Sequence, residues 1–276
     1  MKYIDEMIYG AHANKEIRKL PSEATRIVIK IGTATIAHPT GQLNIRRMER
    51  FVKVLADLKN AGKEIIVVSS GAIGMGVGKL GLAKKPSDLA GKQACAAIGQ
   101  CELMYLYDKY FAEYNHLTAQ VLLTLDAIEL EHRRSYITNT FQKLLKYKVI
   151  PIVNENDTVA VDEIVVGDND TLSAIVCELV DGDLLIILSD IDGLYDDDPR
   201  TNPDAKRIPY LPDITEEELA MAKGEGTSLG TGGMITKLKA AKHGLLHGFS
   251  TIIMHGEDPE LLYDVLEGKD IGTRIG

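Results

Sequence analysis

Three glycines, two threonines and a lysine lie together in the segment GTGGMITK at residues 230–237. Glycine has no Cβ atom, so its backbone can approach a ligand closely. Residues 234–247 have helical spacing, and the free N–H groups at a helix start favour anions, to which Lys237 adds a positive charge. The chain has no Gly-x4-Gly-Lys-Ser/Thr sequence. The segment therefore indicates either a phosphate site of another kind or a flexible loop that caps a helix.

Lys30 is a charged residue inside an otherwise apolar run, IVIKI at residues 27–31, which we predict to be a buried strand. Burying an ammonium group is costly unless it reaches an opposite charge or water. Two interpretations are open at this point. Lys30 is either an edge lysine that extends to water, or a cation held beside Gly32 at the end of the strand, where it would bind an anion.

Two further segments combine carboxylates with amides, NEND at residues 154–157 and GDND at residues 167–170. The first is typical of a turn. It also suits a zwitterionic ligand, with acids for the ammonium group and amides for the carboxylate. The second contains favoured helix N-cap residues, although a cap accounts for only one of them. The others could orient lysines or hold a hydrated Mg²⁺ ion.

The rest of the chain predicts the elements that position these residues, because short apolar runs alternate with segments of helical spacing. The predicted strands are 26–31, 65–68, 119–123, 149–153, 184–188 and 251–254, with a hairpin at 159–166. The predicted helices are 44–60, 87–113, 133–147, 169–180, 215–223, 234–247 and 258–267. Apolar strands bracketed by helices predict an α/β fold, a three-layer αβα sandwich with a mainly parallel central sheet.

Polar residues follow four of the predicted strands. They are Gly32-Thr33, Ser69-Ser70, the segment 154–157 and Ser189-Asp190. Ligands of open parallel sheets bind beyond the carboxyl ends of the strands. The four polar strand ends therefore predict one site at that edge of the sheet.

The composition excludes some classes of function. The chain of 276 residues has a formal net charge of −9 and no basic cluster, which argues against a nucleic-acid partner and against binding to an anionic membrane. No apolar run reaches membrane-spanning length, so we expect a cytoplasmic protein. The three cysteines lack CxxC spacing, and we expect reduced thiols, with Cys95 and Cys177 in the core.

Two other patterns are discounted. Gly76-x-Gly78-x-x-Gly81 matches a dinucleotide-binding fingerprint, but it lies too far beyond the preceding strand, so we expect a glycine-rich loop. His243 and His247 are four residues apart on a predicted helix. No third ligand is near them in the sequence, so we expect ordinary helix residues rather than a metal site.

In this order the motifs resemble those of the amino-acid kinase superfamily and, within it, the glutamate 5-kinases. The pairing of NEND with GDND is specific to that subfamily, whereas DGLY at 192–195 and DPR at 198–200 are shared more widely. The resemblance implies a kinase domain at residues 25–276 after an N-terminal extension at 1–24. It also implies a form without the C-terminal PUA domain that many bacterial relatives carry.

The resemblance also implies a role for individual residues. Lys30, Lys237 and Asp170 match the catalytic positions, where the acid orients the two phosphate-binding lysines. Ser70, Asp157 and Asn169 match the glutamate-binding positions. The positions that match the ATP site are Lys30, Ser189, Asp190, Thr231, Gly232, Gly233, Met234, Ile235, Thr236 and Lys237.

The implied reaction is phosphoryl transfer from ATP to the γ-carboxylate of L-glutamate, the first step of proline biosynthesis, with Mg²⁺ carried mainly by ATP. Proline is implied as a feedback inhibitor, and a homo-oligomer, dimer or tetramer, is expected. The NEND segment argues against the alternative of an acetylglutamate or aspartate kinase. The presence of Lys30, Lys237 and Asp170 argues against an inactive amino-acid-binding regulator. The acidic charge opposes the alternative of a nucleic-acid-binding protein.

Overall fold

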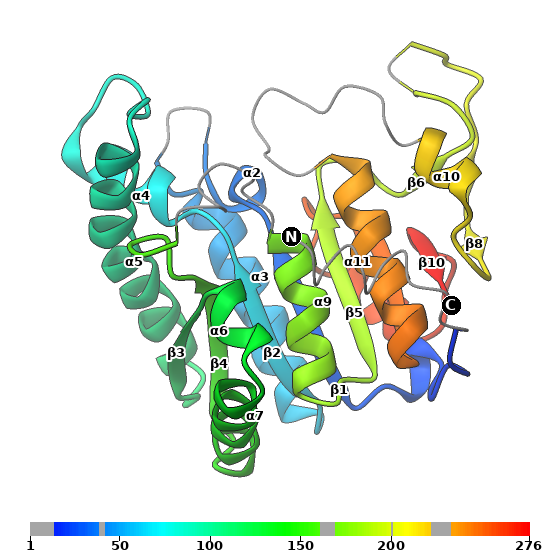
Figure 1. The fold of residues 1–276 in the computed structure, drawn as a ribbon, viewed down its shortest axis with the longest axis horizontal. Helices are drawn as coiled ribbons and strands as arrows, with labels where there is room; N and C mark the ends of the chain where they lie inside the picture. The colour runs from blue at the N-terminus through cyan, green and yellow to red at the C-terminus, as the bar shows by residue number, and fades with distance from the viewer. Residues whose placement is uncertain (1–13, 39–41, 161–168, 200, 222–232) are drawn as a thin grey trace.

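A computed structural model describes residues 14–38, 42–160, 169–199, 201–221 and 233–276. Its centre is a sheet in the order β3-β4-β2-β1-β5-β9-β10-β8 (Figure 1). The first six strands in that order are parallel to one another, and β10 runs antiparallel to β9. Their bounds are β1 Arg26–Ile31, β2 Glu64–Ser69, β3 Thr118–Leu123, β4 Ile150–Glu155, β5 Leu184–Ser189, β8 Tyr210–Leu211, β9 Ser250–His255 and β10 Thr273–Ile275.

Helices cover both faces of this sheet, which confirms the predicted three-layer arrangement. One face packs on α3 (Ile45–Asn60), α5 (Leu89–Ala112) and α12 (Leu261–Leu266). The other packs on α7 (Glu131–Lys146), α9 (Asn169–Leu179) and α11 (Met234–His247). The shorter elements are η1 Pro21–Glu23, α2 Thr33–Ile36, α4 Ala72–Leu80, α6 Leu125–Glu129, β6 Leu194–Tyr195, β7 Arg207–Ile208 and α10 Glu216–Met221.

The side chains of β1 show how the sheet divides the core. Successive residues of a strand point to opposite faces. Ile27, Ile29 and Ile31 belong to the cluster under α3 and α5, whereas Val28 belongs to the cluster under α7 and α9. Every strand residue from 27 to 31 is buried, which is why the strand reads, apart from Lys30, as a continuous apolar run rather than an alternating one.

Most predicted elements are confirmed, and three details differ. β4 extends two residues further than predicted, so Asn154 and Glu155 lie in the strand and are buried. The expected glycine-rich loop at 76–81 is wrong, because residues 72–80 form α4. The short strands β8 and β10 carry too few residues to show a pattern in the sequence. The predicted hairpin at 159–166 lies almost wholly outside the described residues.

The glycines of α4 are explained by its contact with α5. A Cβ atom on Gly76 would lie 1.9 Å from the carbonyl oxygen of Cys95, and one on Gly99 would lie 1.7 Å from that of Ala72. The two helices therefore touch through their backbones, and glycine is the residue that permits this approach. This contact fixes α5 against the residues that follow β2.

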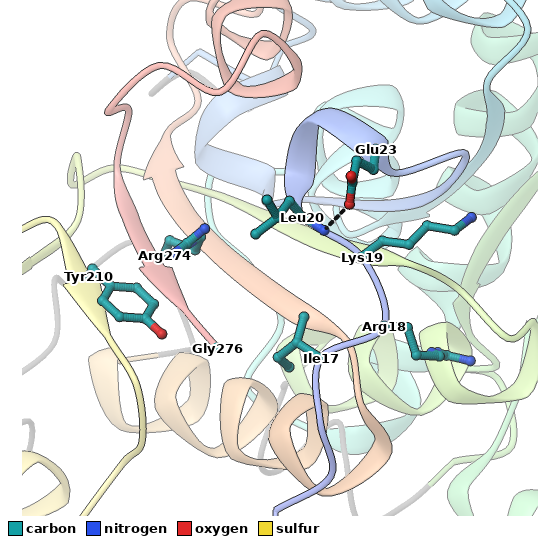
Figure 2. A pocket seen from close by; sticks show the side chains of 8 residues that line it. All are labelled: Ile17, Arg18, Lys19, Leu20, Glu23, Tyr210, Arg274 and Gly276. Carbon is teal, nitrogen blue, oxygen red and sulfur yellow. Dashed lines mark hydrogen bonds between the residues drawn. The ribbon is translucent and has the colours of Figure 1, made fainter.

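The segment before η1 packs on the end of the fold where α11 finishes. The Lys15 N–H donates to the Leu245 carbonyl at 2.8 Å, and Arg18 Nε donates to the Gly248 carbonyl at 3.2 Å. Figure 2 shows the hollow beside this segment, which Leu20, Tyr210 and Arg274 line together with neighbouring residues. None of the predicted site residues that the structure describes lines it. Among the described helices, none is both long and apolar enough to cross a membrane.

The contact between α4 and α5 makes a stability prediction. Gly99→Ala should lower the free energy of unfolding by about 1–3 kcal/mol, the usual cost of overpacking a tight contact. Gly74→Ala in α4 is the matched control, because its Cβ atom would be 3.4 Å from the Thr33 side chain, an ordinary contact. Urea unfolding measures both variants. Equal stabilities for the two variants would contradict the helix contact described above.

Candidate active site

Lys30 is directed into the site by the alternation of β1. Val28 faces α9, so Lys30, two residues later, faces the same way. Its Nζ lies 2.7 Å from Oδ1 of Asp170, the second residue of α9, and the residue is buried. The edge-lysine interpretation is therefore wrong, because the ammonium group reaches a carboxylate rather than open water.

Asp170 joins two lysines that are far apart in the sequence. Its side chain is fully buried, and Lys237 Nζ from the first turn of α11 lies 3.0 Å from Oδ2. The Thr236 hydroxyl donates to the same oxygen at 2.8 Å. The carboxylate thus holds β1, α9 and α11 together at the carboxyl edge of the sheet. The three predicted catalytic residues form one cluster.

The electrostatics of this cluster favour a charged aspartate. Burial alone would raise the pKa of Asp170, but the positive charges of Lys30 and Lys237 outweigh it and hold the pKa below its ordinary value. The carboxylate is therefore ionised at neutral pH. Its charge and those of the two ammonium groups sum to one net positive charge, so the cluster is suited to receive an anion.

The start of α11 adds backbone donors to this cluster. Gly233 is its N-cap, and no side chain from the described part of the chain caps this end. The uncapped N–H groups of a helix start attract anions. Thr236 turns its hydroxyl inward, onto Asp170 and the Gly233 carbonyl. Met234 and Ile235 are partly buried against the apolar cluster around Leu238, so their side chains serve packing. Thr231 and Gly232 lie outside the described residues.

A second polar group lies beside the lysine cluster. Asn169 Nδ2 donates to Ser70 Oγ at 2.8 Å and to Asn154 Oδ1 at 2.9 Å. Ser70 follows β2, Asn154 is in β4 and Asn169 opens α9, so the group spans three elements. Gly71, next to Ser70, has a φ of +114°, a conformation that favours glycine. Two of the three predicted glutamate-binding residues are thus in direct contact.

Asp157, the third predicted glutamate-binding residue, lies in the turn after β4 and is half-buried. It makes no hydrogen bond or ion pair with Ser70 or Asn169 in the part of the chain that the structure describes. Burial raises its pKa to about 6, and the charge of Lys85 opposes that rise. A ligand ammonium beside a carboxyl group desolvated in this way would stabilise its ionised form.

Ser189 and Asp190 lie at the end of β5, next to β1 in the sheet. The Ser189 hydroxyl donates to Asp190 Oδ1 at 3.1 Å. Ser189 is buried and Asp190 is exposed, so the pair runs from the sheet end toward solvent. Since β1 and β5 are adjacent, these residues belong to the same edge as Lys30.

Two features were missed in the sequence. Gln100 of α5 joins the polar group, since its Oε1 accepts from Asn154 Nδ2 at 3.0 Å. The sequence contains a signal for this contact, because Gln100 shares a buried helical stripe with Leu103 and Tyr107. A glutamine on such a stripe indicates a buried polar contact.

The other missed feature corrects the interpretation of the histidines. Glu178 of α9 lies 3.0 Å from His243 Nε2 and 3.5 Å from His247 Nδ1, so a third potential ligand does lie near them. The two imidazole rings stack with centroids 4.3 Å apart. Arg134 also forms an ion pair with Glu178. These groups join the last turns of α9 and α11, at the ends opposite Asp170 and Lys237.

Comparison with known proteins gives the family. The family model described as "Amino acid kinase family" matches residues 25–255. A "Glutamate 5-kinase" of Clostridium perfringens is 52% identical over 93% of this chain and 97% of its own length. One of Enterococcus faecalis is 48% identical over 93% of this chain and 96% of its length.

The solved structures agree on the fold. Carbamate kinase from Giardia lamblia bound to AMP-PNP superposes with a TM-score of 0.63 at 20% identity, covering 92% of this chain and 99% of that one. At such an identity the likeness shows the fold alone. From the family model and the close relatives together, the chain belongs to the amino acid kinase family and, within it, to the glutamate 5-kinases.

Proposed function

We propose that this chain transfers a phosphoryl group from ATP to the γ-carboxylate of L-glutamate, giving γ-glutamyl phosphate for proline biosynthesis. The observation that carries the proposal is the cluster of Lys30, Asp170 and Lys237 beside the pair Ser70–Asn169. The names and identities of the glutamate 5-kinase relatives support the choice of substrate. The site thus has a charged centre that would serve phosphoryl transfer and, beside it, a polar pair that would bind an amino acid.

The chemistry requires charge neutralisation rather than a general base. The nucleophile is a carboxylate with an ordinary pKa of about 4.3, so it is already ionised at neutral pH. The obstacle is its repulsion from the anionic phosphoryl group. Lys30 and Lys237 supply two positive charges at that point, and Asp170 keeps both in place. Positioning and electrostatic stabilisation are the main sources of rate in phosphoryl transfer.

When bound, ATP would supply the phosphoryl group, and Mg²⁺, carried mainly by its phosphates, would neutralise their charge. The residues present fit such a group, because the first turn of α11 and the two buried ammonium groups meet at Asp170 on the same edge of the sheet. Lys30, Lys237, Gly233 and the first turn of α11 would hold the phosphates. Ser189 and Asp190 would lie toward the nucleoside. We extend the same role to Thr231 and Gly232 from the sequence.

Glutamate would lie on the other side of the lysines. Ser70 and Asn169 would bind polar groups of the amino acid, and Asp157 would accept a hydrogen bond from its ammonium group. Proline shares the α-carboxylate and α-ammonium groups but lacks the side-chain carboxylate. A site that recognises the α-groups would also admit proline, so we propose that proline inhibits in competition with glutamate. We further propose a cytoplasmic homo-oligomer with one kinase domain at 25–276.

The two lysines generate the first prediction about activity. Lys30→Ala or Lys237→Ala should lower kcat by roughly 10²–10³-fold, the scale for losing one electrostatic stabiliser of the transition state. Coupled ADP release, checked by hydroxylamine trapping of the acyl phosphate, measures kcat. Lys79→Ala is a control, because this half-exposed lysine pairs with Glu102 away from the cluster. A near-normal kcat in either site variant would remove that lysine from the transferring phosphate.

Asp157 generates a prediction about pH. The ionised carboxylate attracts the substrate ammonium, and protonation removes that attraction. Because the pKa of Asp157 is about 6, KM for glutamate should rise as pH falls through 6, approaching tenfold per unit below it, while KM for ATP changes little. The measurement is KM for both substrates between pH 5 and 8.

Asp157→Asn tests whether this carboxylate is the group responsible. The variant should have a raised KM for glutamate that no longer depends on pH over this range, and inhibition by proline should weaken in parallel. A pH dependence that persists in the variant would assign it to another group. An effect confined to KM for ATP would move Asp157 to the nucleotide side.

A further inference from the structure

Gln100 is a buried glutamine that the reaction described above does not use. It lies on α5 among apolar residues of the same stripe, and its Oε1 accepts from Asn154 Nδ2 at 3.0 Å. Its Nε2 is buried, and among the residues that the structure describes it has no hydrogen-bond partner. An unpaired buried donor costs free energy, so stability alone gives no reason for a glutamine at this position.

The hydrogen bond to Gln100 sets the direction of a chain of hydrogen bonds. Asn154 uses its amide nitrogen on Gln100, so its Oδ1 faces Asn169 and accepts from Asn169 Nδ2. Asn169 Nδ2 also donates to Ser70 Oγ. An amide nitrogen has two hydrogens, and both are used here.

This direction decides which atoms remain for a ligand. Asn169 is left with its Oδ1, an acceptor, which suits an ammonium group. Ser70 accepts through its oxygen and keeps its O–H as a donor, which suits a carboxylate. An acceptor and a donor side by side match the two α-groups of an amino acid. Reversing the direction of these hydrogen bonds would exchange the two roles, because Asn169 would present its Nδ2 as a donor, and Ser70, donating to Asn169 Oδ1, would keep only an acceptor.

The backbone contact between α4 and α5 brings Gln100 to this place. Gly99, the preceding residue, lies against the Ala72 carbonyl in the first turn of α4. The first turn of α4 directly follows Ser70 and Gly71. The same contact therefore fixes both ends of the chain of hydrogen bonds, Gln100 on α5 and Ser70 before α4.

We propose that Gln100 is a positioning residue for glutamate, which acts through Asn154 to orient the Asn169 amide. The inference rests on the proposed function of the Ser70–Asn169 pair. Gln100→Met keeps an unbranched side chain of similar length and removes the acceptor. It should raise KM for glutamate roughly 3- to 10-fold, the scale for one lost hydrogen bond, and change KM for ATP and kcat by less than about twofold.

A double-mutant cycle separates this role from a general effect on folding. If Gln100 acts through Asn154, Gln100→Met should add little to the rise in KM for glutamate that Asn154→Ala produces alone. Gln142→Met, at an exposed glutamine of α7, is the matched control and should leave KM for glutamate unchanged. Thermal unfolding of each variant accompanies the kinetics.

The outcomes are distinct. An unchanged KM for glutamate in Gln100→Met, equal rises in KM for glutamate and ATP, or fully additive effects with Asn154→Ala would each overturn the inference. If wild-type protein does not phosphorylate glutamate, the proposed function itself fails. If Asp157→Asn raises KM for glutamate while Gln100→Met does not, the function stands and only the role of Gln100 is wrong.

Discussion

The arrangement of the site depends on one buried carboxylate, that of Asp170. It accepts from Lys30 of the central strand β1 and from Lys237 of α11, and it stands at the second position of α9. Removing three charges from water costs several kcal/mol for each ion, and mutual attraction offsets this only with good geometry. The sheet provides that geometry, because the alternation of β1 points Lys30 toward the helix layer that carries Asp170.

Around this cluster the fold provides two different surroundings for ligands. On one side the start of α11 offers backbone N–H groups and a positive helix end. On the other, hydrogen-bonded amides connect α5, β4 and α9 to Ser70. An anionic phosphate suits the first surrounding, and a small zwitterion suits the second. The lysines lie between them, where a phosphoryl group would pass from one to the other.

Much of this arrangement could be predicted from the sequence, and the reasons are physical. Apolar runs that end in polar residues gave the strands and the edge at which the site lies. The ion pairs of Asp170 could not be derived from spacing, because Lys30 and Lys237 meet only through the sheet order.

Contacts between helices were the features that the sequence predicted least well. The glycines at 76 and 78 suggested a loop, although Gly76 serves a close crossing of α4 and α5. Glu178 joins His243 from another helix, so no sequence window contains both residues.

The central claim is that the buried ion cluster is retained for phosphoryl transfer rather than for stability. The most direct test compares Asp170→Asn with the triple variant Lys30→Met, Asp170→Val, Lys237→Met by urea unfolding. Asp170→Asn should lose about 3–5 kcal/mol, because two buried ammonium groups lose their carboxylate, whereas the triple variant should be as stable as wild type and without activity. A triple variant that is less stable than Asp170→Asn would contradict the account and make the cluster a structural element.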